Sequence, residues 1–502
     1  MNVIMENISW IAPEIFLFII ITFLLGYGVI YSKLSGVIKQ QTKLTWICII
    51  TLILTGLITL TTIEYTYTIP EIINISSGIM KVDLQTQITK LIIIIGSVGI
   101  LLYSFGQYTG KMLIEFEYAI LILIATLGML LIVSTSDLIF LYLSIELISL
   151  TLYILATINK SGQFSTESGL KYFILGALSS GLLLFGMALI YGTTGETGYT
   201  QIGNILNYIG ENNLGIQVGS LFIIIALLFK LAAAPFHMWA PDVYDGAPTI
   251  ITAFFAIVPK IAILYTLINL VFGPFISIFV NIQPIIFVSA ILSLLVGSIT
   301  GLNQSKFKRL LAYSAIGHMG FMLIGIGTGS LFSLQATFLY IILYAIMSFN
   351  TFGCILSIYR NKANNYITEI SGLSRTFPLL ALTLTIGLLS IAGIPPLAGF
   401  YSKYFILLSA VHSGYIVLAL FAIGTSIISC FFYLRIIKWI YFKDTEDFYL
   451  KEISEVSNIS TIKVDTQKSI ILGITTYIIL TFLIYPNPLL MLTFDSISYS
   501  LI

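Results

Sequence analysis

Long apolar runs follow one another along the whole chain, and short polar connections separate them. The runs are continuous and about 20 residues long, which is the length at which a helix crosses a bilayer, and they lack the alternation of a strand. The pattern predicts fourteen spans, at 10–31, 44–63, 88–105, 116–134, 137–158, 169–192, 216–238, 248–270, 279–301, 310–328, 332–359, 379–411, 414–441 and 469–491. The twelfth is too long for one straight helix, and Pro395 and Pro396 after Gly393 predict a break within it.

Basic residues gather in alternate connections. Connections after odd-numbered spans hold most of the lysines and arginines, whereas those after even-numbered spans hold Lys81, Lys90 near a span edge and several acids. This asymmetry is the positive-inside pattern. It predicts an even number of spans with both termini on the outer side. The charged connection 442–468 is expected to cap the inner face.

Composition agrees with a polytopic membrane protein. The 502 residues are 58% hydrophobic and only 9% charged, whereas a soluble domain carries about 25% charge. The backbone can cross lipid only as helices or as a closed barrel, and the continuous runs select helices. A net charge of +1 gives no indication of nucleic-acid binding. The isoleucine-rich, arginine-poor composition is typical of an AT-rich genome such as an organellar one.

Five ionisable residues lie near the middle of apolar spans, too deep to reach the interface easily: Glu146, Lys230, Lys260, His318 and Lys403. A charge at the bilayer centre costs about 2.5–3.5 kcal/mol on insertion scales. Such a series is hard to explain by packing alone. It predicts a route for protons or ions through the membrane.

The same residues indicate an internal repeat. Spans four to eight and nine to thirteen each form a group of five; Glu146 and His318 lie in the second member, and Lys230 near Pro235 and Lys403 after Pro395–Pro396 lie in the fourth. Because five is odd, consecutive copies must be inverted, as in transporters with broken helices. We expect an N-terminal three-helix segment (1–115), two five-helix repeats (116–270 and 271–441), and an inner-side loop with a C-terminal helix (442–502).

Each buried residue allows two interpretations. Glu146 carries a proton or controls a lysine, or it forms a structural ion pair. Lys230 relays protons, or its charge is permanently neutralised by Glu146. Lys260 and Lys403 relay protons, or each belongs to a fixed ion pair. A buried lysine suits a relay, because low dielectric disfavours the ammonium and allows proton exchange near neutrality. His318 bridges the two halves or is a hydrogen-bonded core histidine.

Two further residues are secondary candidates. His237 reads as part of an inner-side loop, where it takes up protons or orders the loop. Lys171 lies near the start of its span, where snorkelling to the interface would explain it. The sequence offers no phosphate loop, dinucleotide fingerprint or metal-ligand spacing, and Cys48, Cys354 and Cys430 read as small buried hydrophobes. Energy for transport must therefore come from an ion gradient or from a partner.

Several motifs resemble a known family. They are Phe229-Lys-Leu-Ala-Ala-Ala-Pro-Phe-His-Met-Trp-Ala-Pro-Asp-Val-Tyr-Asp-Gly-Ala-Pro-Thr249, Ser144-Ile-Glu-Leu, Glu167-Ser-Gly-Leu-Lys-Tyr-Phe173, Lys308-Arg-Leu-Leu-Ala-Tyr-Ser-Ala-Ile-Gly-His-Met-Gly320 and Gly393-Ile-Pro-Pro-Leu-Ala-Gly-Phe-Tyr-Ser-Lys403. Together they resemble chain 2 of NADH:ubiquinone oxidoreductase, an antiporter-like membrane subunit of respiratory complex I. The first motif is the most specific.

The resemblance implies fourteen helices with discontinuous seventh and twelfth helices, and a hydrated axis through the positions of Glu146, Lys230, Lys260 and Lys403. Lys171 matches a further family lysine. It implies proton translocation driven by NADH-to-quinone electron transfer, with NAD, FMN, iron–sulfur clusters and ubiquinone bound by partner subunits and no cofactor or metal bound by this chain. Expected partners are other complex I membrane subunits, including chains 4 and 4L, and the lipid bilayer.

The expected location is the mitochondrial inner membrane with both termini on the intermembrane-space side, or alternatively a bacterial plasma membrane. A stand-alone or Mrp-type cation/proton antiporter subunit is the competing function. In the hypothesised mechanism Glu146 holds Lys230 charged. A pair 4 Å apart at an effective dielectric of about 20 is worth roughly 4 kcal/mol, enough to move a proton onward when the pair opens.

Overall fold

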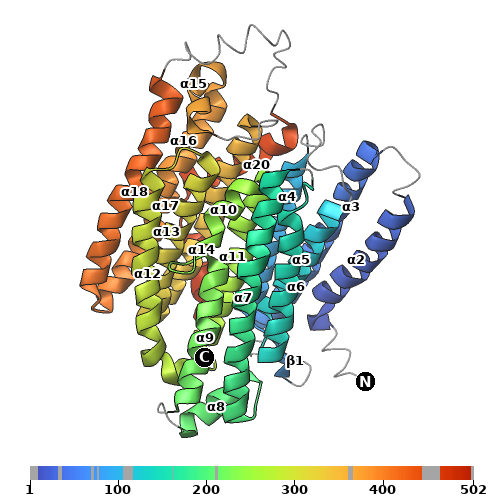
Figure 1. The fold of residues 1–502 in the computed structure, drawn as a ribbon, viewed down its shortest axis with the longest axis vertical. Coiled ribbons are helices and arrows are strands. Elements are labelled where there is room, and N and C mark those ends of the chain that lie inside the picture. The colour runs from blue at the N-terminus through green and yellow to red at the C-terminus, as the bar shows by residue number, and fades with distance from the viewer. Residues whose placement is uncertain are drawn as a thin grey trace.

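The computed structural model describes residues 9–31, 37–68, 73–75, 78–105, 117–160, 162–209, 213–359, 366–443 and 464–498. Long helices run roughly parallel to one another and form a single bundle, with α8 at one end and α15 at the opposite end (Figure 1). Eleven helices in the described part of the chain are long and apolar enough to cross a membrane. The predicted fold class, an all-helical polytopic membrane protein, is confirmed.

The long helices follow the predicted spans closely. They are α2 (Ala12–Tyr31), α3 (Val37–Thr68), α4 (Leu84–Ser104), α5 (Glu117–Val133), α6 (Leu138–Ala156), α7 (Gln163–Thr194), α9 (Leu214–Leu231), α11 (Thr249–Phe272), α12 (Phe279–Leu302), α13 (Phe307–Thr328), α14 (Leu331–Ile358), α16 (Pro378–Ala392), α17 (Ala398–His412), α18 (Ile416–Phe442) and α20 (Thr466–Thr481). Helices α3 and α7 are 32 residues each, longer than predicted. The turns that extend beyond the predicted spans are polar, and a pattern of apolar runs does not include them.

Shorter elements fill the connections. They are a two-stranded antiparallel hairpin of β1 (Ile73–Ile75) and β2 (Met80–Val82), α8 (Tyr199–Ile209), α10 (Trp239–Gly246), η2 (Ile276–Ile278), η3 (Ile367–Ile370), α15 (Leu373–Thr376) and α21 (Asn487–Ser498). Helix α8 was not predicted, although its buried residues Tyr199, Ile202 and Leu206 have helical spacing. The connection expected to cap the inner face lies largely outside the described residues.

The last predicted span, 469–491, is wrong in extent. Helix α20 ends at Thr481, and α21 begins at Asn487. Pro486 and Pro488 lie at this junction. Proline lacks a backbone N–H and cannot continue a helix from the preceding turn, so the apolar run is divided between two helices.

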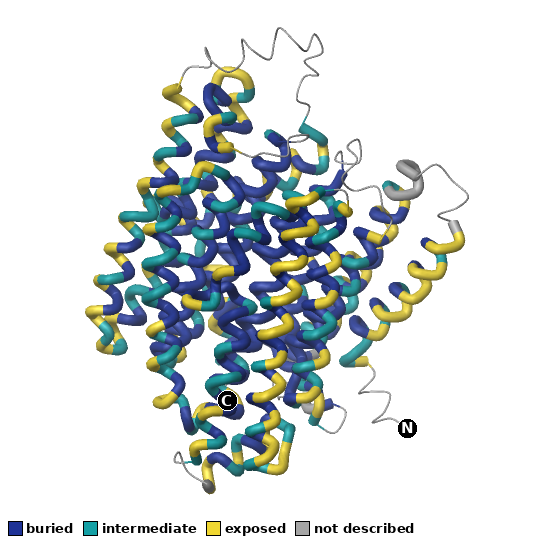
Figure 2. The backbone as a smooth tube through the Cα atoms, in the orientation of Figure 1, coloured by how far each residue is buried: buried dark blue, intermediate teal, exposed yellow. Residues whose placement is uncertain are grey.

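Burial separates a central from a peripheral set of helices (Figure 2). The apolar window of α11 is completely buried, and those of α13 and α14 are 89% and 83% buried, whereas those of α2 and α18 are each 33% buried. The peripheral helices present apolar faces outward, as expected for helices in contact with lipid. Lys260 and His318 are therefore carried by the most enclosed helices of the bundle.

Both predicted helix breaks are present. Helix α9 ends at Leu231, the next residue Ala232 has a positive φ of 59°, and α10 continues after a short irregular segment that contains Pro235. Helix α16 ends at Ala392, the next residue Gly393 has a φ of 84°, and α17 follows the segment that contains Pro395 and Pro396. Each break leaves helix-end carbonyl groups without partners inside the helix, in the middle of the bundle. These carbonyls become part of the candidate site.

Candidate functional site: a buried polar axis

The axis begins on one face of α6. Asp137 fixes the start of this helix by accepting hydrogen bonds from the backbone N–H groups of Ile139 and Phe140. Glu146, Ser149 and Tyr153 then follow at spacings of three and four residues, which places them on one side of the helix. The Ser149 hydroxyl lies 3.3 Å from Glu146 Oε2 as a donor. Glu146 is half-buried rather than enclosed.

Lys230 reaches this face from the last turn of α9. Its ammonium donates to the Tyr153 hydroxyl over 3.4 Å. Among the described residues, no carboxylate lies within 4.0 Å of this ammonium. Glu146 and Lys230 are therefore not in direct contact at the 4 Å used in the electrostatic hypothesis, although the Glu146 charge still acts on the ammonium. Tyr153 lies beside Lys230, and Ser149 connects that end of the helix face to Glu146.

Tyr153 was missed by the sequence analysis, although it is seven residues after Glu146. Its ring meets the edges of Tyr172 and Phe173, with centroids 4.8 and 5.7 Å away. Gly176 on α7 makes room for it, because a Cβ at that position would lie 1.9 Å from the Tyr153 hydroxyl. The packing thus holds the hydroxyl group at the Lys230 ammonium.

Lys260 lies across a small cavity from Lys230. The cavity of about 20 Å³ is lined by both lysines, Ser149 and Trp239, among others. A single water needs roughly 10–15 Å³, so the cavity has room for about one water. Lys260 is buried on α11, and its ammonium lies 5.7 Å from the centroid of the Tyr244 ring.

Two tyrosines one turn apart on α14 connect the first group of five spans to the second. The Tyr344 hydroxyl donates to the carbonyl oxygen of Ala256 on α11 over 3.2 Å, just before Pro259. The Tyr340 hydroxyl lies 2.7 Å from Nδ1 of His318 on α13. His318 is buried and lies within electrostatic range of both Lys260 and Lys403. Its predicted bridging position is consistent with this geometry.

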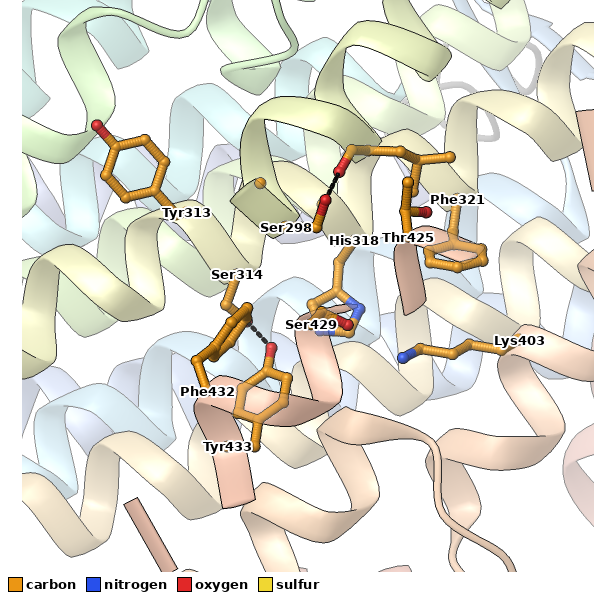
Figure 3. Close-up of a pocket in the computed structure, with 13 residues that line it drawn as sticks. Ser298, Tyr313, Ser314, His318, Phe321, Lys403, Thr425, Ser429, Phe432 and Tyr433 are labelled. Atoms are coloured by element: carbon orange, nitrogen blue, oxygen red, sulfur yellow. Dashed lines mark hydrogen bonds between the residues drawn. The ribbon is translucent and has the colours of Figure 1, made fainter. Parts of the chain in front are cut away.

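Lys403 closes the axis at the second helix break. Its ammonium donates over 2.8 Å to the carbonyl oxygen of Ala392, the last residue of α16. A helix C-terminus carries partial negative charge and unpaired carbonyls, which favour a cation there. Lys403 and His318 line another cavity of about 20 Å³ (Figure 3). Ser314 and Tyr433, which are hydrogen-bonded to each other, line the same cavity.

The two secondary candidates lie apart from these cavities. Lys171 is 45% exposed and forms ion pairs with Glu167 and Asp242 at 2.8 and 3.2 Å. His237 is buried, and Nδ1 has no hydrogen-bond partner among the described residues. Its assignment to an inner-side loop is wrong, because it lies in the break between α9 and α10. The predicted span ended at residue 238, and α10 was read as part of the loop that follows it.

The sequence analysis also missed a buried ion pair near the N-terminus. Glu14 on α2 lies 2.6 Å from Lys90 on α4, and the two side chains are 3% and 1% exposed. From the sequence, Lys90 was noted only as lying near a span edge, and Glu14 was not singled out. A buried acid and base at the ends of two helices can be recognised as partners only when the helices are placed side by side.

The arrangement can hold and exchange protons. Lys230 and Lys260 line one water-sized cavity, and His318 and Lys403 line another. Among the described residues no group of three or more His, Cys, Asp or Glu side chains is placed to hold a metal ion. The chemistry available from the described side chains is proton transfer between amines, an imidazole, hydroxyls and a carboxylate.

Comparison with known proteins shows the family of this chain. Residues 135–429 match the family model described as the transmembrane region of NADH:quinone oxidoreductase and Mrp antiporters. The chain is 38% identical to NADH-ubiquinone oxidoreductase chain 2 of Marchantia polymorpha, over 96% of each chain. It is also 38% identical to NADH-quinone oxidoreductase subunit N of Pelagibacter ubique, over 97% of this chain and 98% of the relative.

A solved structure supports the same assignment. A chain in respiratory complex I from Thermus thermophilus, determined with bound aureothin, superposes with a TM-score of 0.78. The two are 27% identical and the match covers 95% of this chain and 98% of the other. The sequence resemblance is therefore confirmed. This chain belongs to the family of NADH-ubiquinone oxidoreductase chain 2 and NADH-quinone oxidoreductase subunit N, the antiporter-like membrane subunits of complex I.

Proposed function

We propose that this chain translocates protons along the buried axis as a membrane-arm subunit of an NADH:quinone oxidoreductase. Glu146, Lys230, Lys260, His318 and Lys403 are the proposed proton carriers. The observation that carries the proposal is the placement of buried amines and an imidazole beside water-sized cavities at both helix breaks. Placing a charged side chain inside the membrane costs free energy. Ionisable residues found at that depth are therefore typically parts of ion or proton pathways.

The proposed proton steps follow the contacts. A proton on Lys230 is held by the Tyr153 hydroxyl and passes through the shared cavity to Lys260. From there it reaches His318 across the tyrosines of α14, and then Lys403 at the end of α16. Glu146 acts on Lys230 at longer range than assumed from the sequence. Because Coulomb energy falls with distance, its influence is weaker than roughly 4 kcal/mol.

Electron transfer in partner subunits is proposed to supply the energy, and the proposal assigns no redox centre to this chain. NAD, FMN, iron–sulfur clusters and ubiquinone belong to those partners. The adjacent membrane subunits are proposed to include chains 4 and 4L. The proposed location is the mitochondrial inner membrane, with both termini on the intermembrane-space side; the bacterial plasma membrane is the alternative. Lys171 and His237 are proposed as peripheral proton-exchange points.

The test uses the assembled complex in sealed vesicles, with NADH-driven proton translocation measured at equal amounts of complex. Lys230→Ala is expected to abolish most of the translocation. Glu146→Gln, which removes the charge, is expected to impair it more than Glu146→Asp, which keeps the charge. Full translocation by both Lys230→Ala and Glu146→Gln would reject the axis.

A second candidate, an Mrp-type cation/proton antiporter subunit, is favoured by one observation. The family model that matches residues 135–429 covers both classes. Co-purification separates them: the proposed function expects flavin and iron–sulfur subunits to accompany this chain, and their absence from the intact complex would favour the antiporter.

A further inference from the structure

Half-helix α10 lies next to both Lys230 and Lys260, the two central lysines of the first group of spans. Its first residue, Trp239, donates its indole N–H over 2.8 Å to the carbonyl oxygen of Phe229, the residue before Lys230. Near its other end, the Tyr244 ring lies beneath the Lys260 ammonium at 5.7 Å. A shift of this eight-residue helix would therefore disturb both amines together.

The far end of α10 is held by the start of α13. The buried Lys308 ammonium donates to the carbonyl oxygens of Ala247 and Asp245 over 2.8 and 3.3 Å. Lys306 forms an ion pair with the Asp245 carboxylate at 2.8 Å. Because the C-terminus of a helix carries partial negative charge and unpaired carbonyls, two cations there stabilise its position.

A third basic residue of α13 reinforces this contact one turn earlier. Arg309 pairs with Asp242 at 3.0 Å, and the other oxygen of Asp242 pairs with Lys171 of α7 at 3.2 Å. Asp242 is thus shared between the two groups of spans. Lys306, Lys308 and Arg309, called here the basic clamp, all come from the second group, whereas the helix that they hold belongs to the first.

Ordinary surface ion pairing explains only part of this arrangement. The side chains of Lys306 and Asp245 are 28% and 24% exposed, and such pairs contribute little by themselves. Lys308 is different, because it is buried and its ammonium is directed at two backbone carbonyls. Burying a cation against a helix end fixes the backbone of that helix rather than a side chain.

We propose that the basic clamp positions α10 for proton transfer and couples the second group of spans to Lys230 and Lys260. The inference rests on the proposed function. In this arrangement Lys306, Lys308 and Arg309 are positioning residues and carry no protons. The clamp keeps Trp239 and Tyr244 in place, and so keeps Lys230 and Lys260 at their common cavity.

Reversing the charges of the Asp245–Lys306 ion pair tests the clamp. Asp245→Lys and Lys306→Asp each place like charges together, whereas the double variant restores an opposite pair with its direction reversed. At equal amounts of assembled complex, we expect each single variant to lower NADH-driven proton translocation about two- to fivefold, as for a partly exposed pair, and the double variant to recover most of it. Asp495→Lys, on α21, is the control for reversing an acid elsewhere.

Lys308 provides a second, independent measurement. Lys308→Met is expected to lower translocation about tenfold, because two buried carbonyls lose a charged donor. Lys308→Arg keeps the charge and is expected to retain more activity than Lys308→Met. If Lys308→Met does not assemble, the isosteric Asp242→Asn, which weakens the clamp without removing a large side chain, is expected to lower translocation in the assembled complex.

The outcomes are distinct. Recovery in the double variant supports the clamp, because a general loss of folding would not be repaired by a second reversal. Wild-type translocation in the Asp245→Lys, Lys306→Asp and Asp242→Asn variants, together with loss in Lys230→Ala, overturns the clamp and leaves the proposed function intact. Wild-type translocation in Lys230→Ala as well overturns the proposed function, and the inference with it.

Discussion

Gly393 offers a direct test of whether the position of the Lys403 ammonium matters. This glycine has a φ of +84°, and a Cβ placed on it would lie 2.9 Å from Lys403 Cδ and 3.2 Å from Nζ. Non-bonded carbon atoms prefer about 3.5–4.0 Å. Gly393→Ala must therefore push the flexible lysine side chain, and its ammonium, away from the Ala392 carbonyl oxygen at 2.8 Å.

Gly393→Ala carries two separate costs in free energy. Alanine in the left-handed conformation costs about 1–2 kcal/mol, whatever its surroundings. Loss of a hydrogen bond with a charged partner costs about 1.5–3 kcal/mol more. If the second contribution raises the barrier of the proton step at Lys403, that step slows about ten- to hundredfold.

Gly414 supplies the matched control. Its φ is +85°, nearly the same as at Gly393, but a Cβ there has nothing within 4 Å. Gly414→Ala therefore carries the backbone cost without the contact to Lys403.

The assay compares NADH-driven proton translocation in sealed vesicles at equal amounts of assembled complex. Gly393→Ala should lose most of the activity, and Gly414→Ala should keep most of it. Equal activity in the two variants would refute the reasoning, because the displaced ammonium would then have no effect on transport.

Two further predictions concern hydroxyl groups along the axis. Tyr153→Phe removes the hydroxyl group that accepts a hydrogen bond from Lys230. Because this bond is long at 3.4 Å, we expect its loss to cost about 1 kcal/mol. If that cost raises the barrier to proton transfer, translocation slows about fivefold. Tyr191→Phe on α7, whose side chain is exposed, is its control, and equal rates in the two variants would contradict the role of Tyr153. Tyr340→Phe leaves Nδ1 of His318 without its partner at 2.7 Å and should destabilise the His318 site by about 1–3 kcal/mol. Slower translocation with unchanged assembly is the expected measurement, and an unchanged rate would contradict a proton step at His318.

The sequence determined the membrane architecture and most of the proposed axis. Apolar runs of spanning length specify transmembrane helices because an unpaired backbone group is too costly in lipid. Pro235, Pro395 and Pro396 marked the two breaks for an equally local reason, since proline removes a helical hydrogen bond. Lys260, His318 and Lys403 were recognisable because a charge in the middle of an apolar run is rare.

Only the tertiary structure decided which of these groups meet. Glu146 and Lys230 looked like a direct pair, yet the packing of α6 against α7 at Gly176 places Tyr153 beside the ammonium. In the sequence, Lys308 is one more basic residue in a connection. In the structure, it is buried against the end of α10. A local pattern fixes the depth of a side chain in the membrane, because depth depends on position along one helix. The partner of that side chain depends on the rotation and approach of several helices, which packing across the whole bundle sets.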